Sequence, residues 1–444
     1  MTNSTQHKEH LLAKIEDKSV LVGVIGLGYV GLPLSLTFVE KGIRALGFDV
    51  DTKKITAIEE GVNYVKHLPE GKVKDAVANR MFEATTDFAR LKEVDVAVIC
   101  VPTPLNKQRD PDLSYVKSTA HAIGQNLQKG QLVVLESTTF PGTTDEIVCD
   151  ILEDESGLKS GDDFFLAFSP EREDPGNKSF NTAKIPKVVG GTCAASGEVA
   201  DALYKQAVTS SVLVSSSRVA EAAKLTENIF RAVNIALVNE LKVVYDKMGI
   251  DVWEVLDAAD TKPFGFMRFN PGPGWGGHCI PLDPFYLSYK AREYGVTPKF
   301  IELAGEVNVD MPVYVIDKLQ EALNKEGKAM NGAKVMMLGI AYKKDIDDPR
   351  ESPAFELLDQ LLAKGVKVTY HDPHIAVAPR MRSWPDLPTM ESQPLTDDNL
   401  KAQDAVMVVT DHTAIDWGAV EQNSSLIIDT RGVYRAPRAN VVKA

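Results

Sequence analysis

The sequence predicts an α/β protein with two Rossmann-like, doubly wound parallel-sheet domains joined by a long central helix. Short apolar runs rich in β-branched residues alternate with helical patterns before residue 170 and again after residue 330, an order typical of parallel α/β sheets. Between them, residues 217–247 contain neither proline nor glycine, which indicates one long helix. The 444 residues are also too many for one ordinary core, so length favours two or three domains.

The composition is that of an ordinary globular protein. Hydrophobic residues make up 44% and charged residues 25%, and the net charge of −13 argues against nonspecific binding to nucleic acid or anionic membranes. The polar first residues, and apolar runs well short of the roughly 20 residues of a membrane span, predict a soluble, cytoplasmic protein. The four cysteines have neither metal-site nor disulfide spacing, so no metal and no disulfide framework are expected.

The first domain carries the element order of a dinucleotide site. The elements are strand Val20–Ile25, loop Gly26–Gly31, helix Leu32–Lys41 and strand Ile43–Phe48. This order cradles a pyrophosphate on a helix N-terminus, and Asp49 at the second strand end would hold a ribose or, alternatively, only cap the strand. Asp49 would repel a 2′-phosphate, which favours NAD over NADP, although the nearby Lys54 weakens that preference. The residues expected to hold the cofactor here are Gly26, Gly28, Tyr29, Val30, Gly31, Asp49 and Lys54.

Two later strands of this domain place polar side chains at the same sheet edge. They are expected at Val94–Val101 and Gln131–Thr138. Because ligands of such folds bind at the carboxyl ends of the strands, Thr103, Glu136 and Thr138 are expected near the nicotinamide.

Three polar residues further along could act on a substrate. Glu171 follows a strand at Phe164–Ser169, where it would serve as a base or, equally, as an exposed turn acid. Lys224 and Asn228 share one face of the apolar helix Ser217–Lys247, which we expect to be buried between domains or subunits. Both are costly there without partners, which favours function over a lysine that reaches solvent.

The stretch Pro271–Asp283 places a single thiol, Cys279, in a glycine-dense loop. The glycines remove side-chain bulk, so a ligand could approach the backbone and the sulfur closely. Cys279 is therefore either a nucleophile or a buried free cysteine beside an irregular turn.

The last third repeats the pattern of the first domain. Strands are expected at Ala333–Ile340, Gly365–Asp372, Gln403–Thr410 and Ser425–Asp429, with a helix near Ala354–Lys364. The loop after the first of these strands lacks the later glycines, so it is poor for a dinucleotide. Basic residues replace them and suit an anionic ligand such as a nucleotide diphosphate, or else line a solvated loop. They are Lys343, Lys344, Arg350 and Arg431.

Motifs along nearly the whole chain resemble those of the UDP-glucose and GDP-mannose 6-dehydrogenase superfamily. They are Gly26–Gly31, Val101–Pro104, Glu136–Thr138, Ser169–Glu171, Lys224–Asn228, Gly276–Cys279 through Asp283, and Tyr342–Asp345 leading to Ser352. The resemblance implies oxidation of a sugar C6 alcohol to a carboxylate with two NAD reduced per sugar. It also implies an NAD-binding domain at 1–205, a central dimerising domain at 206–315 and a UDP-sugar-binding domain at 316–444.

The resemblance also assigns roles to residues. Cys279 would be the nucleophile, Lys224 and Asn228 the oxyanion-stabilising pair, Glu171 and Asp283 the acids, and Thr138 the residue that holds water. Arg350 would contact the cofactor, together with Thr103 and Thr138. The residues expected to contact the substrate are Glu171, Arg172, Lys224, Asn228, Arg268 (across a dimer), Phe269, Gly276, Tyr342, Lys343 and Arg431.

Two positions indicate the substrate branch. Where the glucose-specific branch has an acid and a lysine, this chain has Pro175 and Leu282, as in the branch acting on UDP-N-acetylhexosamines, most closely the UDP-N-acetylglucosamine enzymes of O-antigen biosynthesis. UDP-N-acetylgalactosamine and UDP-glucose remain alternative substrates. A two-electron hydroxyacid dehydrogenase and a non-catalytic nucleotide-sugar-binding protein remain alternative classes. The expected partners are a UDP-sugar and further copies of the chain in a homodimer or larger oligomer, without nucleic acid or membrane.

Overall fold

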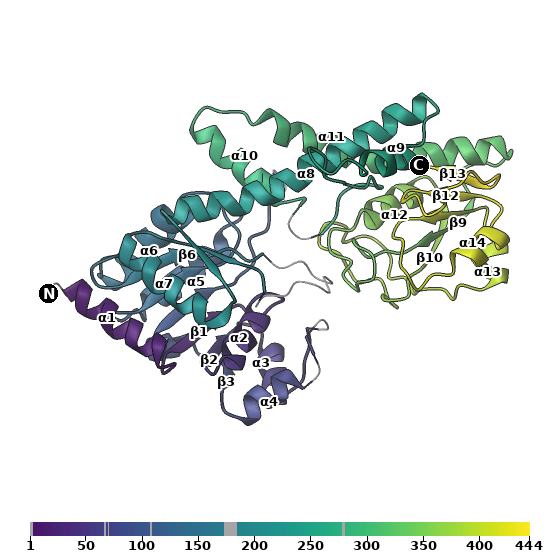
Figure 1. Cartoon of the computed structure of the whole chain (residues 1–444). Coiled ribbons are helices and arrows are strands. Elements are labelled where there is room, and N and C mark those ends of the chain that lie inside the picture. The colour runs from purple at the N-terminus through teal and green to yellow at the C-terminus, as the bar shows by residue number, and fades with distance from the viewer. Residues whose placement is uncertain (1–2, 66–67, 70, 107–108, 173–183, 278–279) are drawn as a thin grey trace. The chain divides into compact units, whose positions relative to one another are not determined.

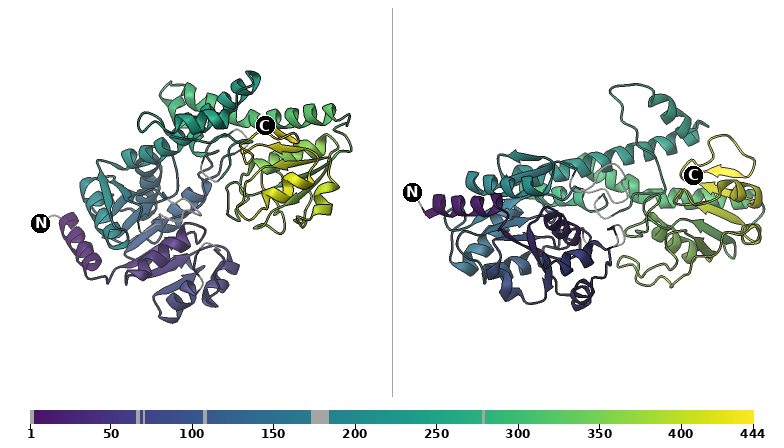
Figure 2. Two further views of the ribbon diagram at one scale, coloured as in Figure 1. Left: turned by 45° about the vertical axis from the view of Figure 1, so that its right-hand side comes forward. Right: turned by 60° about the horizontal axis from the view of Figure 1, so that its bottom comes forward.

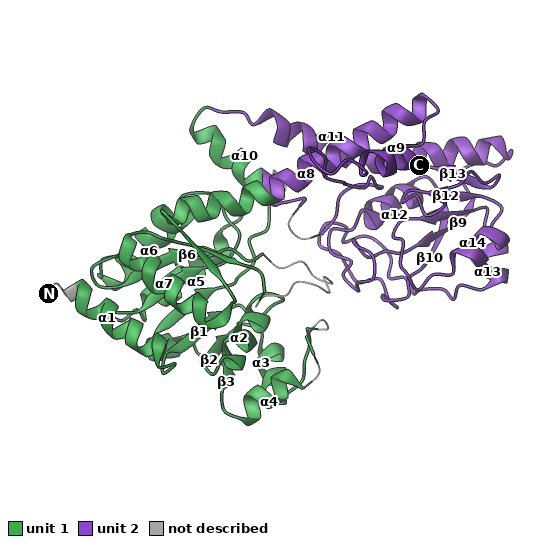
Figure 3. Ribbon diagram, viewed as in Figure 1, with its two compact units in different colours: residues 1–227, 285–295 green, residues 228–284, 296–444 purple. Residues whose placement is uncertain are grey.

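The computed structural model describes residues 3–65, 68–69, 71–106, 109–172, 184–277 and 280–444 (Figure 1). The chain divides into two compact units (Figure 3). Residues 1–227 and 285–295 form the N-terminal unit, and residues 228–284 and 296–444 form the C-terminal unit. The boundary falls within the long helix α8 (Ser217–Lys247), whose bounds confirm the expected helix.

The N-terminal unit is built on an eight-stranded sheet with the order β3-β2-β1-β4-β5-β6-β7-β8. Its strands are β1 Leu21–Ile25, β2 Arg44–Phe48, β3 Phe82–Thr85, β4 Val96–Ile99, β5 Leu132–Leu135, β6 Phe165–Phe168, β7 Lys187–Gly191 and β8 Ser211–Val214. Its helices are α1 Asn3–Glu16, α2 Gly31–Glu40, α3 Thr52–Glu59, α4 Lys72–Ala78, α5 Ser114–Gly124, α6 Cys149–Ser156, α7 Ala194–Ala207, the start of α8 and most of α10 (Asp283–Glu293).

Helices cover both faces of this sheet (Figure 2). One core contains Leu11, Phe38 and Leu203 from α1, α2 and α7, and the core on the other face contains Ile123 and Leu152 from α5 and α6. The central strands are buried along their whole length, as parallel strands covered on both faces must be. The pair β6–β7 is antiparallel, the one departure from the expected parallel order among the described strand pairs of the two sheets.

The C-terminal unit repeats the architecture with a five-stranded parallel sheet of order β10-β9-β11-β12-β13. Its strands are β9 Lys334–Leu338, β10 Lys367–His371, β11 Ala405–Val408, β12 Ile427–Asp429 and β13 Val441–Lys443. Its helices are the end of α8, α9 Val252–Ala259, α11 Lys299–Lys325, α12 Pro353–Ala363, α13 Asp397–Lys401 and α14 Trp417–Asn423. The predicted fold class is confirmed. No helix in the described part of the chain is long and apolar enough to cross a membrane.

Candidate active site

The glycine loop after β1 is shaped for a ligand that approaches the backbone. A Cβ on Gly26, which has φ +95°, would lie 2.7 Å from a carbonyl oxygen at the end of β4, and a Cβ on Gly31 would lie 2.0 Å from the Gly26 oxygen. The fold itself therefore requires these two glycines. A Cβ on Gly28 would meet no described atom within 4 Å, so packing does not explain this glycine, whereas close approach of a pyrophosphate does. Val30 provides no side-chain cap for α2, and Tyr29 is half exposed beside it.

Asp49, at the end of β2, directs its carboxylate to this loop. Its Oδ2 accepts the Leu27 N–H at 2.8 Å and its Oδ1 accepts the Asp51 N–H at 2.9 Å. The Lys54 ammonium lies 2.7 Å from Oδ2 and remains partly exposed. Backbone N–H groups thus fix the Asp49 carboxylate where the ribose of NAD would reach it. Lys54 pairs with the same carboxylate and is itself partly exposed.

The ends of β4 and β5 are tied together by side-chain hydroxyls. Thr103 Oγ1 donates to the Thr138 carbonyl at 2.8 Å, and Ser137 Oγ donates to the Val101 carbonyl at 2.7 Å. Tyr286 in α10 donates to the Thr103 carbonyl. The structure therefore brings Thr103 and Thr138 together at the carboxyl edge of the sheet, as the sequence indicates.

Glu136, directly after β5, is engaged by buried partners of its own unit. It is 1% exposed, the Lys187 ammonium lies 2.8 Å from its Oε2, and the Tyr204 hydroxyl donates to its other oxygen. Burial raises the pKa of Glu136, against the opposing effect of Lys187. Its carboxylate is a buried structural group, because neighbours inside the unit already satisfy it.

Glu171 is held from two sides within the N-terminal unit. Lys224 Nζ donates to its backbone carbonyl at 2.5 Å, and Lys187 Nζ lies 3.9 Å from its carboxylate. Lys224 is 6% exposed, so it does not extend into solvent. Arg172 pairs with Glu227 of α8 at 2.6 Å. Of the two interpretations of Glu171, a base or an exposed turn acid, these contacts argue against the exposed turn acid.

Asn228, on the part of α8 that belongs to the C-terminal unit, is 1% exposed and donates to the Asp283 carboxylate, which is 3% exposed. Arg231 donates to the Asn228 carbonyl oxygen. Both ends of the amide are therefore fixed, and the two residues that the sequence assigned to one site lie in contact. Phe269 packs edge-on against Phe230, with ring centroids 5.8 Å apart.

The glycines of the loop Gly272–Gly277 fit against residues of the expected nucleotide site. A Cβ on Gly272 would lie 2.5 Å from the Arg431 guanidinium, and a Cβ on Gly276 would lie 3.0 Å from Tyr342. At both positions side chains of the same unit lie where a Cβ would be, so packing alone already accounts for these two glycines. Cys279 and His278 lie outside the described residues.

The remaining basic candidates have acidic neighbours. Arg350 donates to Asp348 at 2.9 Å, and Arg268 pairs with Asp257 at 2.6 Å. Lys343 is half-buried. These arginines would have to exchange partners, or share them, in order to contact a cofactor or substrate.

Comparison with known families matches three successive segments of the chain. Residues 20–208 match the NAD binding domain of the UDP-glucose/GDP-mannose dehydrogenase family, residues 218–310 its central domain and residues 336–436 its UDP binding domain. The chain belongs to the UDP-glucose/GDP-mannose dehydrogenase family. The prediction of an NAD-dependent UDP-sugar dehydrogenase, with NAD as cofactor, is confirmed.

Relatives within the family differ in their sugar. The chain is 36% identical to a UDP-N-acetyl-D-glucosamine 6-dehydrogenase of Pseudomonas aeruginosa over 83% of this chain and 86% of the relative. It is 33% identical to an NDP-N-acetyl-D-galactosaminuronic acid dehydrogenase of Ralstonia nicotianae over 94% and 97%. A UDP-D-ManNAc dehydrogenase structure from Pyrococcus horikoshii superposes with a TM-score of 0.85 at 30% identity, covering 95% of this chain and 98% of that one.

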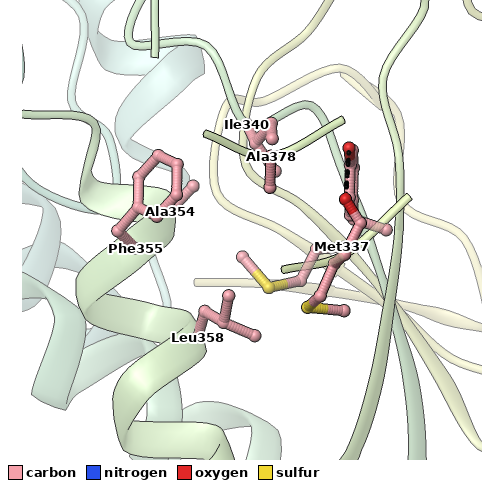
Figure 4. A pocket seen from close by; sticks show the side chains of 8 residues that line it. Met337, Ile340, Ala354, Phe355, Leu358 and Ala378 are labelled. Carbon is pink, nitrogen blue, oxygen red and sulfur yellow. Dashed lines mark hydrogen bonds between the residues drawn. The ribbon is translucent and has the colours of Figure 1, made fainter. Parts of the chain in front are cut away.

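Two of the described thiols, Cys100 and Cys149, are not activated as nucleophiles. Burial raises the pKa of Cys100 well above its usual range and raises that of Cys149 to about 11. A small pocket in the C-terminal unit offers no site either, since α12 and β9 close it with apolar side chains of the core (Figure 4). Its lining is Met337, Ile340, Ala354, Phe355, Leu358, Tyr370, Ala378 and Met390.

Two residues around the family's site were missed by sequence reasoning. Lys187 begins a strand, where a lysine is usually exposed, yet it is 4% exposed between two carboxylates. Glu221, one turn before Lys224, accepts the Gly142 N–H at 2.7 Å and the Thr144 N–H at 2.9 Å. Only the three-dimensional packing shows that both are buried.

Proposed function

We propose that the protein oxidises the C6 hydroxyl of UDP-N-acetylglucosamine to the carboxylate, giving UDP-N-acetylglucosaminuronate for surface polysaccharide. The overall reaction consumes one water and two NAD, each of which accepts one hydride from C6. UDP-N-acetylgalactosamine and UDP-glucose are the alternative substrates. The identity to a UDP-N-acetyl-D-glucosamine 6-dehydrogenase supports this choice, and similarly close N-acetylgalactosaminuronate and N-acetylmannosamine relatives compete with it.

The residues divide the chemistry into two oxidations joined by a covalent step. Loss of a hydride and a proton from the alcohol gives an aldehyde, and the Cys279 thiolate adds to its carbonyl carbon to form a thiohemiacetal. Loss of a second hydride gives a thioester, and water cleaves it to the acid and the free thiol. Lys224 and Asn228 stabilise the oxyanions, while Glu171, Asp283 and Thr138 orient water and move protons.

The arrangement of α8 carries the proposal. One helix supplies Lys224 and Asn228, each buried, and each hydrogen-bonds to a residue that the family motifs place in the same site, Glu171 and Asp283 respectively. A non-catalytic nucleotide-sugar-binding protein would have no use for a lysine and an amide buried in this way. A two-electron dehydrogenase could use both residues, so the number of NAD consumed decides between these schemes.

The experiment is a substrate panel followed by NADH absorbance. UDP-N-acetylglucosamine, UDP-N-acetylgalactosamine, UDP-glucose and GDP-mannose are each turned over to completion. We expect the highest kcat/KM with UDP-N-acetylglucosamine and two NADH per sugar. One NADH per sugar, or a higher kcat/KM for another sugar, contradicts the reaction or the substrate respectively. Cys279→Ser should leave no acid product.

We also propose that two copies of the chain associate through the central segment. Phe230, Leu237 and Val244 recur every seven residues on α8 and are 46%, 50% and 45% exposed in the single chain. A regular apolar stripe of this kind is typical of a helix that packs on a partner. The division at residues 205 and 315 belongs to the same proposal, with 206–315 as the dimerising segment. Light scattering on Leu237→Lys, which should become monomeric, tests it.

A further inference from the structure

Lys242 is a buried cation without a hydrogen-bond partner. It lies on α8, in the C-terminal unit, and is 3% exposed. Its ammonium meets no hydrogen-bond acceptor among the described residues, and lies 5.8 Å from the centre of the Tyr314 ring of α11. A charged amine in this position is costly unless something compensates its charge.

The carboxylates around Lys242 are engaged elsewhere. Asp246, one turn further along α8, pairs with Lys318 of α11 at 2.8 Å. Asp429, at the end of β12, accepts the backbone N–H groups of Arg431 at 3.1 Å and Tyr434 at 3.0 Å.

Burial consequently lowers the pKa of Lys242 to about 7. Asp429 and Asp246 act against this shift, while Arg431 and Lys318 add to it. Two carboxylates and two cations thus oppose each other around the amine, and burial is the main cause of the lowered pKa.

Lys242 lies beside residues of the expected nucleotide site. Asn239, one turn earlier on α8, accepts the Gly272 N–H at 2.9 Å. A Cβ on Gly272 would in turn lie 2.5 Å from the Arg431 guanidinium. Arg431 donates through Nε to the Val409 carbonyl at 2.7 Å, a neutral acceptor. A chain of contacts thus joins the helix turn of Lys242 to Arg431.

We propose that Lys242 is a further substrate-binding residue, which together with Arg431 holds a phosphate of the UDP-sugar. The inference rests on the proposed function, since it adds a residue to the same nucleotide site. A phosphate oxygen supplies the acceptor and the negative charge that the buried amine lacks. Lys242 binds substrate in its charged form, so an amine that is mostly neutral at pH 8 takes up a proton when the nucleotide binds.

Calorimetric titration of the full chain with UDP tests this role. Lys242→Met should weaken UDP binding by about 10- to 100-fold, the effect of losing one charge-assisted hydrogen bond. The matched control is Lys318→Met, which removes a neighbouring cation that already has a carboxylate partner and should leave UDP affinity unchanged. Because Lys242→Met also removes a buried amine that has no hydrogen-bond partner among the described residues, its Tm without UDP should be no lower than that of the wild type.

The wild-type protein provides a second measurement that does not depend on any variant. Titrations at pH 8 in two buffers of different ionisation enthalpy should show uptake of about one proton per UDP, and Lys242→Met should lose this uptake. Binding of UDP without proton uptake, or equal UDP affinity in Lys242→Met, overturns the role of Lys242 while leaving the proposed function intact. Failure of the wild type to bind UDP overturns both.

Discussion

The first strand of each sheet is followed by a glycine in the same backbone conformation, but the surroundings of the two glycine loops differ. In the N-terminal unit, Gly26 follows β1 with φ +95° and donates to the Phe48 carbonyl at 2.8 Å. In the C-terminal unit, Gly339 follows β9 with φ +80° and donates to the His371 carbonyl at 2.8 Å. In each unit the next residue of the neighbouring strand's end is an aspartate that accepts a backbone N–H of the glycine loop. Asp49 accepts the Leu27 N–H, and Asp372 accepts the Ile340 N–H.

The difference lies in what surrounds that aspartate. Asp49 has the partly exposed Lys54 as its outer partner, whereas Asp372 accepts from His412, which is fully buried. His412 Nδ1 also accepts the Asp345 N–H at 3.0 Å, so both ring nitrogens have partners inside the C-terminal unit. Both aspartates are buried, Asp49 at 6% and Asp372 at 4% exposure, so the two loops differ in the neighbouring side chain: a partly exposed lysine at Asp49 and a buried histidine at Asp372. The shared backbone alone therefore does not distinguish the two loops; the side chain paired with the aspartate does.

The largest effect expected from this comparison is on NAD binding by Gly28→Val. Its side chain would occupy the space where the phosphates approach the backbone, and loss of two charge-assisted hydrogen bonds should weaken NAD binding by at least about 100-fold. Because a Cβ there meets no described atom within 4 Å, the Tm should change little. NAD titration and thermal unfolding of the same variant measure both quantities. Unchanged NAD affinity would contradict the assignment of this loop.

The counterpart substitution, Gly339→Ala, should act on stability instead. A Cβ there would lie 2.5 Å from the Thr410 carbonyl oxygen, in a left-handed backbone conformation. Strain and overpacking should together lower the free energy of unfolding by about 3 kcal/mol. Urea denaturation measures the loss, and NAD affinity of the folded fraction should match the wild type. A wild-type midpoint would show that this loop can relax at little cost.

Much of this comparison could be predicted from the sequence, but not its decisive part. The strands and the glycine loop follow from β-branched runs and from glycine spacing, and even the echo of Asp49 by Asp372 is visible in the order of elements. The pairing of Asp372 with His412 brings together residues 40 positions apart in the chain, so no local pattern reveals it. Lys187 and Lys242 were missed for the same reason, since burial of a lysine depends on elements distant in sequence.

The two units also differ in a buried carboxylate: the pKa of Glu221 in the N-terminal unit is raised, and that of Asp372 in the C-terminal unit is lowered. Burial raises the pKa of Glu221 to about 7, despite hydrogen bonds from Thr144 and Gly142. At Asp372, burial also acts to raise the pKa, but hydrogen bonds from His412 and Ile340 outweigh it, and the pKa is lowered. The contribution of Glu221 to stability is therefore lost as pH rises from about 4.5 to 7, and the contribution of Asp372 is lost as pH falls below about 4.

Glu221→Gln should reduce the change in the free energy of unfolding between about pH 4.5 and pH 7. With its folded pKa raised, Glu221 contributes stability that is fully present below pH 4.5 and lost through pH 7, by about 3 kcal/mol in total. The amide does not titrate, so the free energy of unfolding of the variant should vary less between about pH 5 and about pH 7.5 than that of the wild type. Urea titrations at several pH values measure the slope. Equal slopes in the variant and the wild type would mean that Glu221 is not the titrating group.

The smallest effect is expected from Asp49→Asn, and it concerns cofactor choice. An asparagine can still accept the Leu27 N–H but no longer repels a 2′-phosphate, and it releases Lys54 from its carboxylate partner. NAD binding should weaken by about tenfold, near 1.4 kcal/mol, while NADP binding improves. The paired substitution Asp372→Asn should leave the affinities for NAD and NADP unchanged and lower the Tm. The Asp372 carboxylate accepts hydrogen bonds from groups of its own unit, among them the Ile340 and His374 N–H groups. If the ratio of NAD to NADP affinity in Asp49→Asn equals that of the wild type, the cofactor ribose does not bind at Asp49. The difference between Asp49 and Asp372 would then have no role in cofactor binding.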